Sequence, residues 1–424
     1  MNLSYLRDKV IKIADDLEVT KGINTGRSIM YNDVFIPRIF FDNTTYRETI
    51  KKLTENKELN SMVSNNMIIG RFNQIIKNYI KNKDKDTTSN TIKDDLIKDI
   101  KAFEVYASQK KKFKIYVPVK GIKLYKDKVT LSNNVTLLNI DENTILEYLP
   151  QMKTESEISQ LYPTALEVEV VSAEFQKAME HTIDIGKFVV NYLRLVDYFG
   201  WDEEDLSVRL PGYGSLKEEL RVFAVDSNWD GVHSWKNREK NEEILEMDHA
   251  FFEDLEKWGL GQFGNLLDKY LAFELSNLDV SVLRSITWFG ESKVEVDMGA
   301  RFVKLMLAIE SLLNTNSSDP ITATLRDRMA FILGETVEQR LEISKKMTEL
   351  YKQRSEIVHH GSSKVNFENL MILQELTANA ILEFLSNKKL LSFKNKKEMQ
   401  DSFERTKYSN RQGLINRKNL KLKT

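Results

Sequence analysis

Apolar residues at helical spacing dominate the pattern of this chain. Near its start, Leu6, Val10, Ile13 and Leu17 recur every three or four residues, which is typical of a helix with one buried face. The same period returns in the region around Val189 and dominates after about residue 245. We therefore expect a mainly α protein, α+β overall, in which packed helices supply most of the core.

A second pattern, with a period of two, occupies a shorter part of the chain. Phe113, Ile115 and Val117 alternate with polar residues, and further alternating runs separated by turn residues continue to about residue 140. This predicts a small antiparallel β meander over residues 112–140. Residues 166–171 indicate one more strand. The Gly- and Trp-containing residues 210–231 are expected to form a loop.

Four amphipathic segments with short connections follow one another between residues 290 and 390. Asp319 and Pro320 supply an N-cap and a first-turn proline for the second segment. The third is expected at about 336–360 and the fourth at about 366–387. This arrangement predicts an up-and-down four-helix bundle. Its expected core positions are Phe302, Leu305, Met306, Ile309, Leu312 and Leu313 in the first helix, Leu325, Met329 and Ile332 in the second, and Leu341, Met347, Leu350 and Ile357 in the third.

The changes of pattern divide the chain into five segments. They are a mostly helical region at 1–105, a small antiparallel β segment at 106–175, a helical and loop region at 176–289, the four-helix bundle at 290–390, and a basic C-terminal tail at 391–424.

Composition excludes several classes of protein. The chain has 424 residues, 41% of them hydrophobic, and no Cys, so structural disulfides, thiol nucleophiles and Cys-ligated zinc are excluded. Its first residues mix both charge signs, and no run of about 18 apolar residues occurs. We expect a cytoplasmic protein without a membrane partner.

Charge is balanced overall but unevenly distributed. The chain carries 62 Lys and Arg against 63 Asp and Glu. From Lys388 to Thr424, however, there are 12 basic and 3 acidic residues. Such a tail suits contact with phosphate or another acidic surface. A solvated, frayed C-terminus is the alternative, and the sequence leaves both open.

One glycine-rich motif resembles a dinucleotide-binding fingerprint only superficially. Residues 259–264 match G-x-G-x-x-G, and Asp279 lies near the acidic position of such a site. The fingerprint requires a preceding strand, whereas residues 250–258 have a helical pattern. We therefore expect a helix-to-helix turn.

Other polar clusters lack the spacing of a functional site. His181, His233 and His249 are scattered, and the acidic groups at 202–205 and 242–243 do not alternate like a calcium loop. We expect neither a metal nor another cofactor. Aromatic and basic side chains also occur together at Trp229, Trp235, Trp258, Arg221, Arg238 and Lys240. Such a mixture suits stacking on single-stranded nucleic acid. Packing of the Trp side chains in the core is the favoured interpretation.

The segment 350–361 combines groups that suit phosphodiester chemistry. Arg354 and His359 lie five residues apart near a predicted helix end at Gly361. At about 100° per residue, their side chains project about 140° apart, whereas Ser355 and His359 share a face. A guanidinium and a titratable imidazole suit phosphate binding and proton transfer. Simple capping of the helix is the alternative.

This segment resembles the R-x-x-x-x-H signature of the HEPN superfamily, and its surroundings resemble the Apea-like branch. The resemblance covers about residues 290–390. It implies a four-helix bundle that dimerises, so that Arg and His of both protomers share one cleft, and a metal-independent RNase of the toxin–antitoxin, abortive-infection and antiphage type. The residues that carry it are Tyr351, Arg354, Ser355, Ile357, Val358, His359 and Gly361, with Arg301, Phe302 and residues 308–313 of the first helix.

The resemblance also implies roles for individual residues. His359 is expected to act as general acid and base, and Arg354 to hold the scissile phosphate. Three supporting roles follow: Ser355 orients the phosphate or the histidine, His360 assists or caps the helix, and Glu310 pairs with Arg354 across the bundle.

The expected protein is thus a homodimeric RNA endonuclease effector of bacterial antiphage defence, with RNA as its partner. Residues 1–289 would be a sensor or regulatory region that responds to a phage-derived or regulatory protein trigger. Two alternatives remain: a noncatalytic HEPN-type module that binds nucleic acid, a nucleotide or a protein partner, and a purely structural helical protein.

Overall fold

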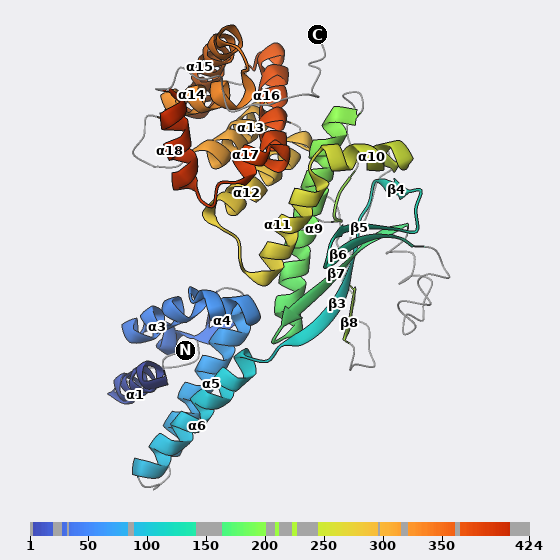
Figure 1. The fold of residues 1–424 in the computed structure, drawn as a ribbon. Helices are drawn as coiled ribbons and strands as arrows, with labels where there is room; N and C mark the ends of the chain where they lie inside the picture. Colours follow the sequence, from blue (N-terminus) through green and yellow to red (C-terminus); the bar gives the residue numbers. More distant parts are fainter. Residues whose placement is uncertain are drawn as a thin grey trace. The chain divides into compact units, whose positions relative to one another are not determined.

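The chain is described by a computed structural model that is mostly helical, with a small antiparallel sheet (Figure 1). The mainly α prediction is therefore confirmed. The chain divides into two compact units, Met1–Phe113 with Glu169–His181, and Lys114–Val168 with Thr182–Thr424. These units divide the chain at other positions than the five segments expected from the sequence. The described residues are 3–19, 28–31, 34–83, 89–140, 163–200, 208–211, 223–226, 245–295, 297–314, 321–360 and 365–407.

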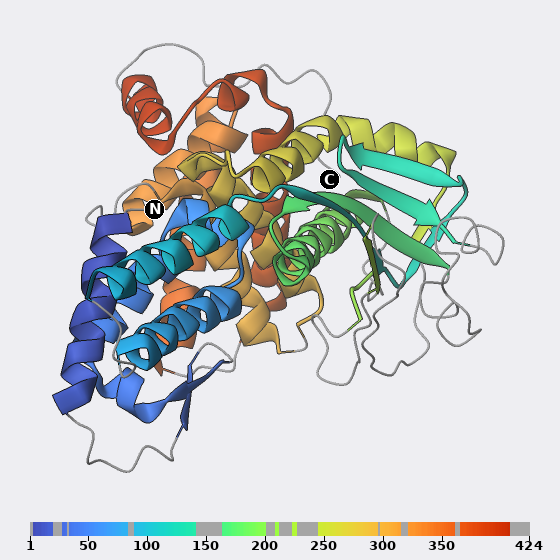
Figure 2. The same ribbon diagram turned by 90° about the horizontal axis from the view of Figure 1, so that it is seen from below.

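The first unit is built on helices. The apolar positions Leu6, Val10, Ile13 and Leu17 are buried as predicted. Tyr46 donates a hydrogen bond to Asn73 at 2.6 Å inside this core, and α5 and α6 lie side by side (Figure 2). The elements of the unit before its sheet strands are α1 (Leu3–Val19), β1 (Ser28–Tyr31), β2 (Val34–Pro37), α2 (Arg38–Asp42), α3 (Thr44–Thr54), α4 (Lys57–Met62), α5 (Asn65–Lys83) and α6 (Ser89–Ala107).

The antiparallel β1–β2 hairpin was not predicted in this mostly helical region. Its apolar residues form two short runs, 28–31 and 34–37, rather than an alternating pattern. The sequence signal that it does carry is Asn32-Asp33 between the two runs, a pair of residue types that favour turns.

The main sheet has the strand order β5-β6-β7-β3-β8. The predicted meander is confirmed for the β5–β6 hairpin, but the expected succession along residues 112–140 is wrong. β7 pairs with β6, and β4 leaves the sheet to pair in parallel with β9. Alternation identifies which side chains are buried, but it does not select the pairing strand. The strands are β3 (Lys111–Pro118), β4 (Ile122–Leu124), β5 (Lys128–Ser132), β6 (Val135–Asn139), β7 (Thr164–Ser172), β8 (Phe223–Asp226) and β9 (Leu245–Met247).

Strands β7 and β8 lie in segments for which the sequence predicted a strand and a loop. The further strand expected at residues 166–171 is present as β7. The loop expected at 210–231 is wrong for residues 223–226, which form β8, a strand too short for its alternation to stand out. Helix α9 (Phe175–Gly200) follows β7 and buries Val189, Tyr192 and Val196.

Helices α10 (His249–Lys257) and α11 (Leu260–Ala272) are joined at the glycine-rich motif. The helix-to-helix turn is thus confirmed. Gly259 has a φ of 82°, a conformation that favours glycine. A Cβ at Gly264 would collide with the carbonyl of Leu131, so this glycine allows α11 to approach β5. The motif serves packing, and Asp279 belongs to the capping box of α12 (Asn277–Lys293).

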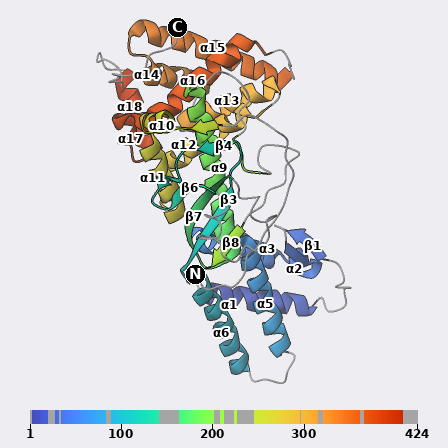
Figure 3. The same ribbon diagram turned by 90° about the vertical axis from the view of Figure 1, so that its right-hand side faces the viewer.

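The C-terminal helices begin and end close to their predicted residues. They are α13 (Met298–Leu313), α14 (Ile321–Leu333), α15 (Val337–His360) and α16 (Phe367–Ser386). The Asn366 side chain caps α16 by accepting from the backbone of Asn369. Helix α12 packs along α13 and also contacts α16, so five helices share this core (Figure 3). Asp319 and Pro320 lie outside the described residues.

Most of the predicted core positions of these helices are confirmed, but Ile357 is only partly buried and Leu341 is exposed. All of those in α13 and α14 are buried, as are Met347 and Leu350 in α15, whereas Leu341 is 66% exposed. Leu341 precedes Met347 by six residues, which is about 240° around the helix at about 100° per residue. It therefore lies on a different face from the buried stripe, and its assignment to the core was wrong.

The C-terminal segment contains ordered structure. Helices α17 (Lys388–Leu391) and α18 (Lys396–Lys407) follow α16. Met399 and Phe403 are buried, and the ammonium of Lys407 lies 2.8 Å from the carboxylate of Asp327. A frayed terminus is therefore the wrong interpretation for residues 396–407, and residues 408–424 lie outside the described residues. A helix able to cross a bilayer is absent from the described part of the chain.

Candidate active site on helix α15

Helix α15 places Arg354 on its buried stripe. The helix starts with reciprocal hydrogen bonds between Thr336 and Gln339, a capping-box arrangement. Its apolar contacts follow at Met347 and Leu350, which are 1% and 0% exposed. Arg354 continues this stripe after four residues. A helix that buries this face must also take the guanidinium out of water, and the Arg354 side chain is only 20% exposed.

Glu310 on α13 meets Arg354 across the helix packing. Arg354 Nε and Glu310 Oε1 lie 3.5 Å apart, so the expected ion pair is present. Both atoms are buried, and neither has a hydrogen-bond partner among the described residues. Arg354 therefore forms an ion pair but makes no hydrogen bond with any residue that the structure describes. The Tyr351 ring lies beside it, with 5.8 Å between the ring centroid and the guanidinium carbon.

The electrostatics of this pair follow from its burial. Loss of water raises the pKa of the Glu310 carboxyl, and the nearby Arg354 only partly offsets this. The pKa of Tyr351 is also raised, first by burial and then by the negative charge of Glu310. The site thus holds a cation whose carboxylate partner ionises less readily than an ordinary glutamate.

His359 and Ser355 lie on other faces of the same helix. His359 is exposed and Ser355 is half-buried. No hydrogen bond or ion pair joins His359 to Arg354 or Ser355 within the described part of the chain. This agrees with the divergence of about 140° that five residues impose. One chain therefore brings Arg354 and Glu310 together but keeps His359 apart. His360 ends the helix, and its side chain lies outside what the structure describes.

Apolar side chains surround the end of α15. A Cβ at Gly299 would lie 3.6 Å from Ile357 and 4.0 Å from Val365, so the starts of α13 and α16 both adjoin this end. Three large apolar residues next to these positions are exposed to solvent: Met298 at 46%, Val358 at 46% and Phe367 at 59%. These side chains offer apolar surface close to the charged residues of the helix.

Two hydrogen bonds that could not be predicted from the sequence join the helices around the site. Asn369 on α16 donates to Gln353 on α15 at 2.9 Å. Arg301 on α13 donates to the buried Gln374 on α16 at 2.7 Å. Arg301 belongs to the segment that resembles the HEPN opening helix, but its partner lies 73 residues away, and a single sequence contains no pairing signal over that distance.

The other candidate residues do not assemble into a site. His181 is buried, and its ring lies 3.0 Å from the carbonyl of Ser61. His249 is exposed and lies 3.5 Å from Glu253. Trp258 packs edge-on against Phe251, as the core-packing interpretation predicts. Outside the described residues lie His233, the acidic groups at 202–205 and 242–243, Trp229, Trp235, Arg221, Arg238 and Lys240.

In the described ranges, no three His, Asp or Glu side chains gather closely enough to share a metal ion.

Comparisons with protein-family models, with curated proteins and with solved structures found no match to this chain.

Proposed function

We propose that this protein is a metal-independent RNA endonuclease, with Arg354 and His359 as its catalytic residues. The observation that carries the proposal is a largely buried arginine that makes no hydrogen bond to a described residue, on the same helix as an exposed histidine. Buried polar groups are usually hydrogen-bonded, and exceptions often mark functional positions. Together with the resemblance to Apea-like HEPN domains, this favours an effector of bacterial antiphage defence of the abortive-infection type.

Arg354 suits the binding of a phosphodiester. A guanidinium presents its donors in a planar fork that matches two phosphate oxygens. Glu310 lies 3.5 Å from Nε, so it can orient the guanidinium while the terminal NH₂ groups would contact the phosphate. Placed this way, Arg354 would stabilise the negative charge that builds on the nonbridging oxygens during cleavage.

His359 would supply the proton transfers. It accepts the proton of the RNA 2′-OH while that oxygen attacks phosphorus, and the bond to the 5′-oxygen breaks as an imidazolium returns a proton to the leaving group. The products are a 2′,3′-cyclic phosphate and a 5′-OH. RNA provides the nucleophile itself, so this mechanism leaves DNA uncut. General acid–base catalysis of this kind contributes about 10² to 10⁴ in rate. Ser355 and His360 would have supporting roles.

A homodimer would complete the site. His359 diverges from Arg354 on one helix, so a second copy that contributes its own helix end would bring the two kinds of group to one phosphate. The exposed side chains of Met298, Val358 and Phe367 offer apolar surface for such an interface. Residues 1–289 would then act as the sensor or regulatory region for a phage-derived or regulatory protein trigger.

A second function is favoured by the same ion pair. Glu310 already neutralises part of the charge of Arg354, and a fixed carboxylate opposes a phosphate in the same place. In a noncatalytic module, this pair would instead stabilise a surface that binds nucleic acid, a nucleotide or a protein partner. Salt-dependent RNA binding by the purified protein without cleavage would support this alternative.

The test is a cleavage assay with purified full-length protein and single-stranded RNA. Arg354→Ala and His359→Ala should each lower the rate by at least about 10² while gel filtration and circular dichroism stay unchanged. Arg7→Ala and His249→Ala are matched controls, because Arg7 is half-exposed, His249 is exposed, and each pairs with a neighbouring surface carboxylate. Cleavage at the wild-type rate by both site variants would show that the site is wrongly assigned.

A further inference from the structure

Three uncharged side chains lie on the surface of α15 between Arg354 and His359. At about 100° per residue, Val358, Tyr351 and Ser355 project about 40°, 60° and 100° from Arg354. His359 follows in the same direction at about 140°. These three side chains form the Tyr351 face. A ligand that Arg354 holds and that extends toward His359 on the same helix therefore lies on this face.

The acidic side chains of α15 project away from the Tyr351 face. They lie about 200° to 240° from Arg354, and they are Glu338, Glu342, Glu349 and Glu356. The carboxylate of Glu310 approaches from α13, but it pairs with Arg354 at 3.5 Å. Carboxylates of α15 therefore oppose a polyanion less on the Tyr351 face than on the opposite side of the helix.

Tyr351 places an aromatic ring next to the guanidinium. The ring centroid lies 5.8 Å from the guanidinium carbon of Arg354. Tyr351 is half-buried, so part of its surface reaches solvent. The hydroxyls of Tyr351 and Ser355 make no hydrogen bond with a residue that the structure describes, and Val358 adds apolar surface that is 46% exposed. An aromatic ring beside a guanidinium is the kind of surface on which proteins stack unpaired RNA bases.

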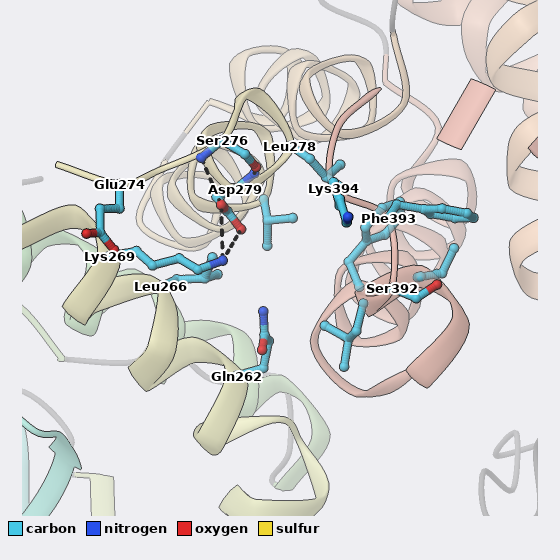
Figure 4. A pocket seen from close by; sticks show the side chains of 14 residues that line it. Gln262, Leu266, Lys269, Glu274, Ser276, Leu278, Asp279, Ser392, Phe393 and Lys394 are labelled. Atoms are coloured by element: carbon cyan, nitrogen blue, oxygen red, sulfur yellow. Dashed lines mark hydrogen bonds and ion pairs between the residues drawn. The ribbon is translucent and has the colours of Figure 1, made fainter. Parts of the chain in front are cut away.

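The pocket in Figure 4 differs from the Tyr351 face in its charges. It lies in the second unit, and its walls come from α11, α12, α16, α17 and the segment that follows α17. The ammonium of Lys269 lies 3.3 Å from each carboxylate oxygen of Asp279. Lys394 and Glu274 line the same hollow. Basic and acidic side chains therefore balance there, which favours neither an anion nor a cation.

We propose that Tyr351 stacks on an unpaired nucleobase next to the phosphate that Arg354 holds. The arginine binds the backbone and the ring binds the base, so the two contacts hold one nucleotide. Bases in a duplex are covered by their neighbours, so this contact selects single-stranded RNA. The inference rests on the proposed function, because it takes Arg354 as the phosphate-binding residue. It adds Tyr351 as a binding residue for the substrate.

Binding measurements test this inference without relying on cleavage. Fluorescence anisotropy is followed with the full-length protein and a labelled single-stranded 2′-O-methyl oligonucleotide, which lacks the 2′-OH that the proposed reaction needs. Tyr351→Leu should weaken binding by about tenfold or more, because the ring is lost. Tyr351→Phe keeps the ring and should bind within about threefold of the wild type. Tyr125→Leu is the matched control, since Tyr125 is 53% exposed and lies outside the Tyr351 face.

An abasic oligonucleotide of the same length distinguishes stacking from positioning of Arg354. If Tyr351 stacks on a base, the wild type and Tyr351→Leu should bind the abasic strand with equal affinity. If the ring only positions Arg354, Tyr351→Leu should weaken binding of the abasic and the intact strand by the same factor, which would overturn the inference. A duplex of the same sequence should bind both proteins equally, because its bases are not available for stacking.

The inference is also overturned if the wild type does not bind the intact strand, or if Tyr351→Leu binds it as tightly as the wild type. It fails as well if Tyr351→Phe or Tyr125→Leu weakens binding as much as Tyr351→Leu. Binding that depends on Tyr351 and on the bases, without cleavage of ordinary RNA, would contradict only the RNase activity. Cleavage that depends on Arg354 and His359, with no effect of Tyr351→Leu on binding, would contradict only the stacking.

Discussion

Helices α15 and α16 are consecutive and of similar length, but they treat their buried polar groups differently. In α16, Gln374 accepts from Arg301 at 2.7 Å, and Thr377 donates to the carbonyl of Leu373 at 2.6 Å. Glu383 accepts from Asn387 at 2.8 Å. Each of these groups is at most 3% exposed. In α15, Gln353 likewise accepts from Asn369 at 2.9 Å, but Arg354 has the 3.5 Å ion pair with Glu310 and no hydrogen bond to a described residue.

The two helices differ in whether all of their buried polar side chains have hydrogen-bond partners. A buried group that has its hydrogen bonds stabilises the fold, whereas one that lacks them costs free energy unless a ligand supplies them. On this basis the buried polar groups of α16 stabilise the fold, and we propose that Arg354 in α15 is available for a ligand.

Removal of apolar side chains should affect the two helices very unequally. Leu373 in α16 is fully buried, so Leu373→Ala should cost about 2–5 kcal/mol in the free energy of unfolding. Leu341 in α15 is 66% exposed, so Leu341→Ala should change it by less than about 0.5 kcal/mol. Urea denaturation followed by circular dichroism measures both. Equal costs would mean that α15 is buried in the protein in solution.

Replacement of polar groups should distinguish the helices next. Gln374→Leu removes the acceptor of Arg301 and should cost about 1–3 kcal/mol. The double variant Arg354→Met, Glu310→Gln removes a buried pair that lacks hydrogen bonds, so its stability should equal or exceed that of the wild type. If the double variant is less stable than Gln374→Leu, the Arg354–Glu310 pair stabilises the fold, and the contrast between α15 and α16 is wrong.

The smallest effect concerns pH. The folded-state pKa of Glu310 is raised above its usual value of 4.5, mainly by burial. The contribution of this group to stability is therefore fully present below about pH 4.5 and declines as pH rises through the folded pKa. Glu310→Gln stays neutral, so its stability relative to the wild type should increase over this interval. A constant difference between pH 4 and pH 8, measured by thermal unfolding, would contradict the raised pKa.

Much of this region follows from the sequence, because helical periodicity and caps are local properties. The stripe from Phe302 to Leu313 and the cap at Asn366 were identifiable from spacing and residue type. The low exposure of the Arg354 side chain was not predicted, although Arg354 follows the buried Leu350 by four residues and therefore lies on the same helix face. Contacts between residues far apart in the sequence could not be predicted either. Examples are the pairing of β7 with β6 and the hydrogen bond between Arg301 and Gln374.

We propose that Arg354 and His359 cut RNA without a metal. The most direct measurement is incubation of the purified wild-type protein and His359→Ala with total cellular RNA in EDTA, alone and with phage-infected lysate as a source of trigger, followed by mapping of the new RNA ends. We expect cuts by the wild type alone, and these cuts should leave 2′,3′-cyclic phosphates. Equal cutting by His359→Ala, or no wild-type cutting under either condition, would contradict it.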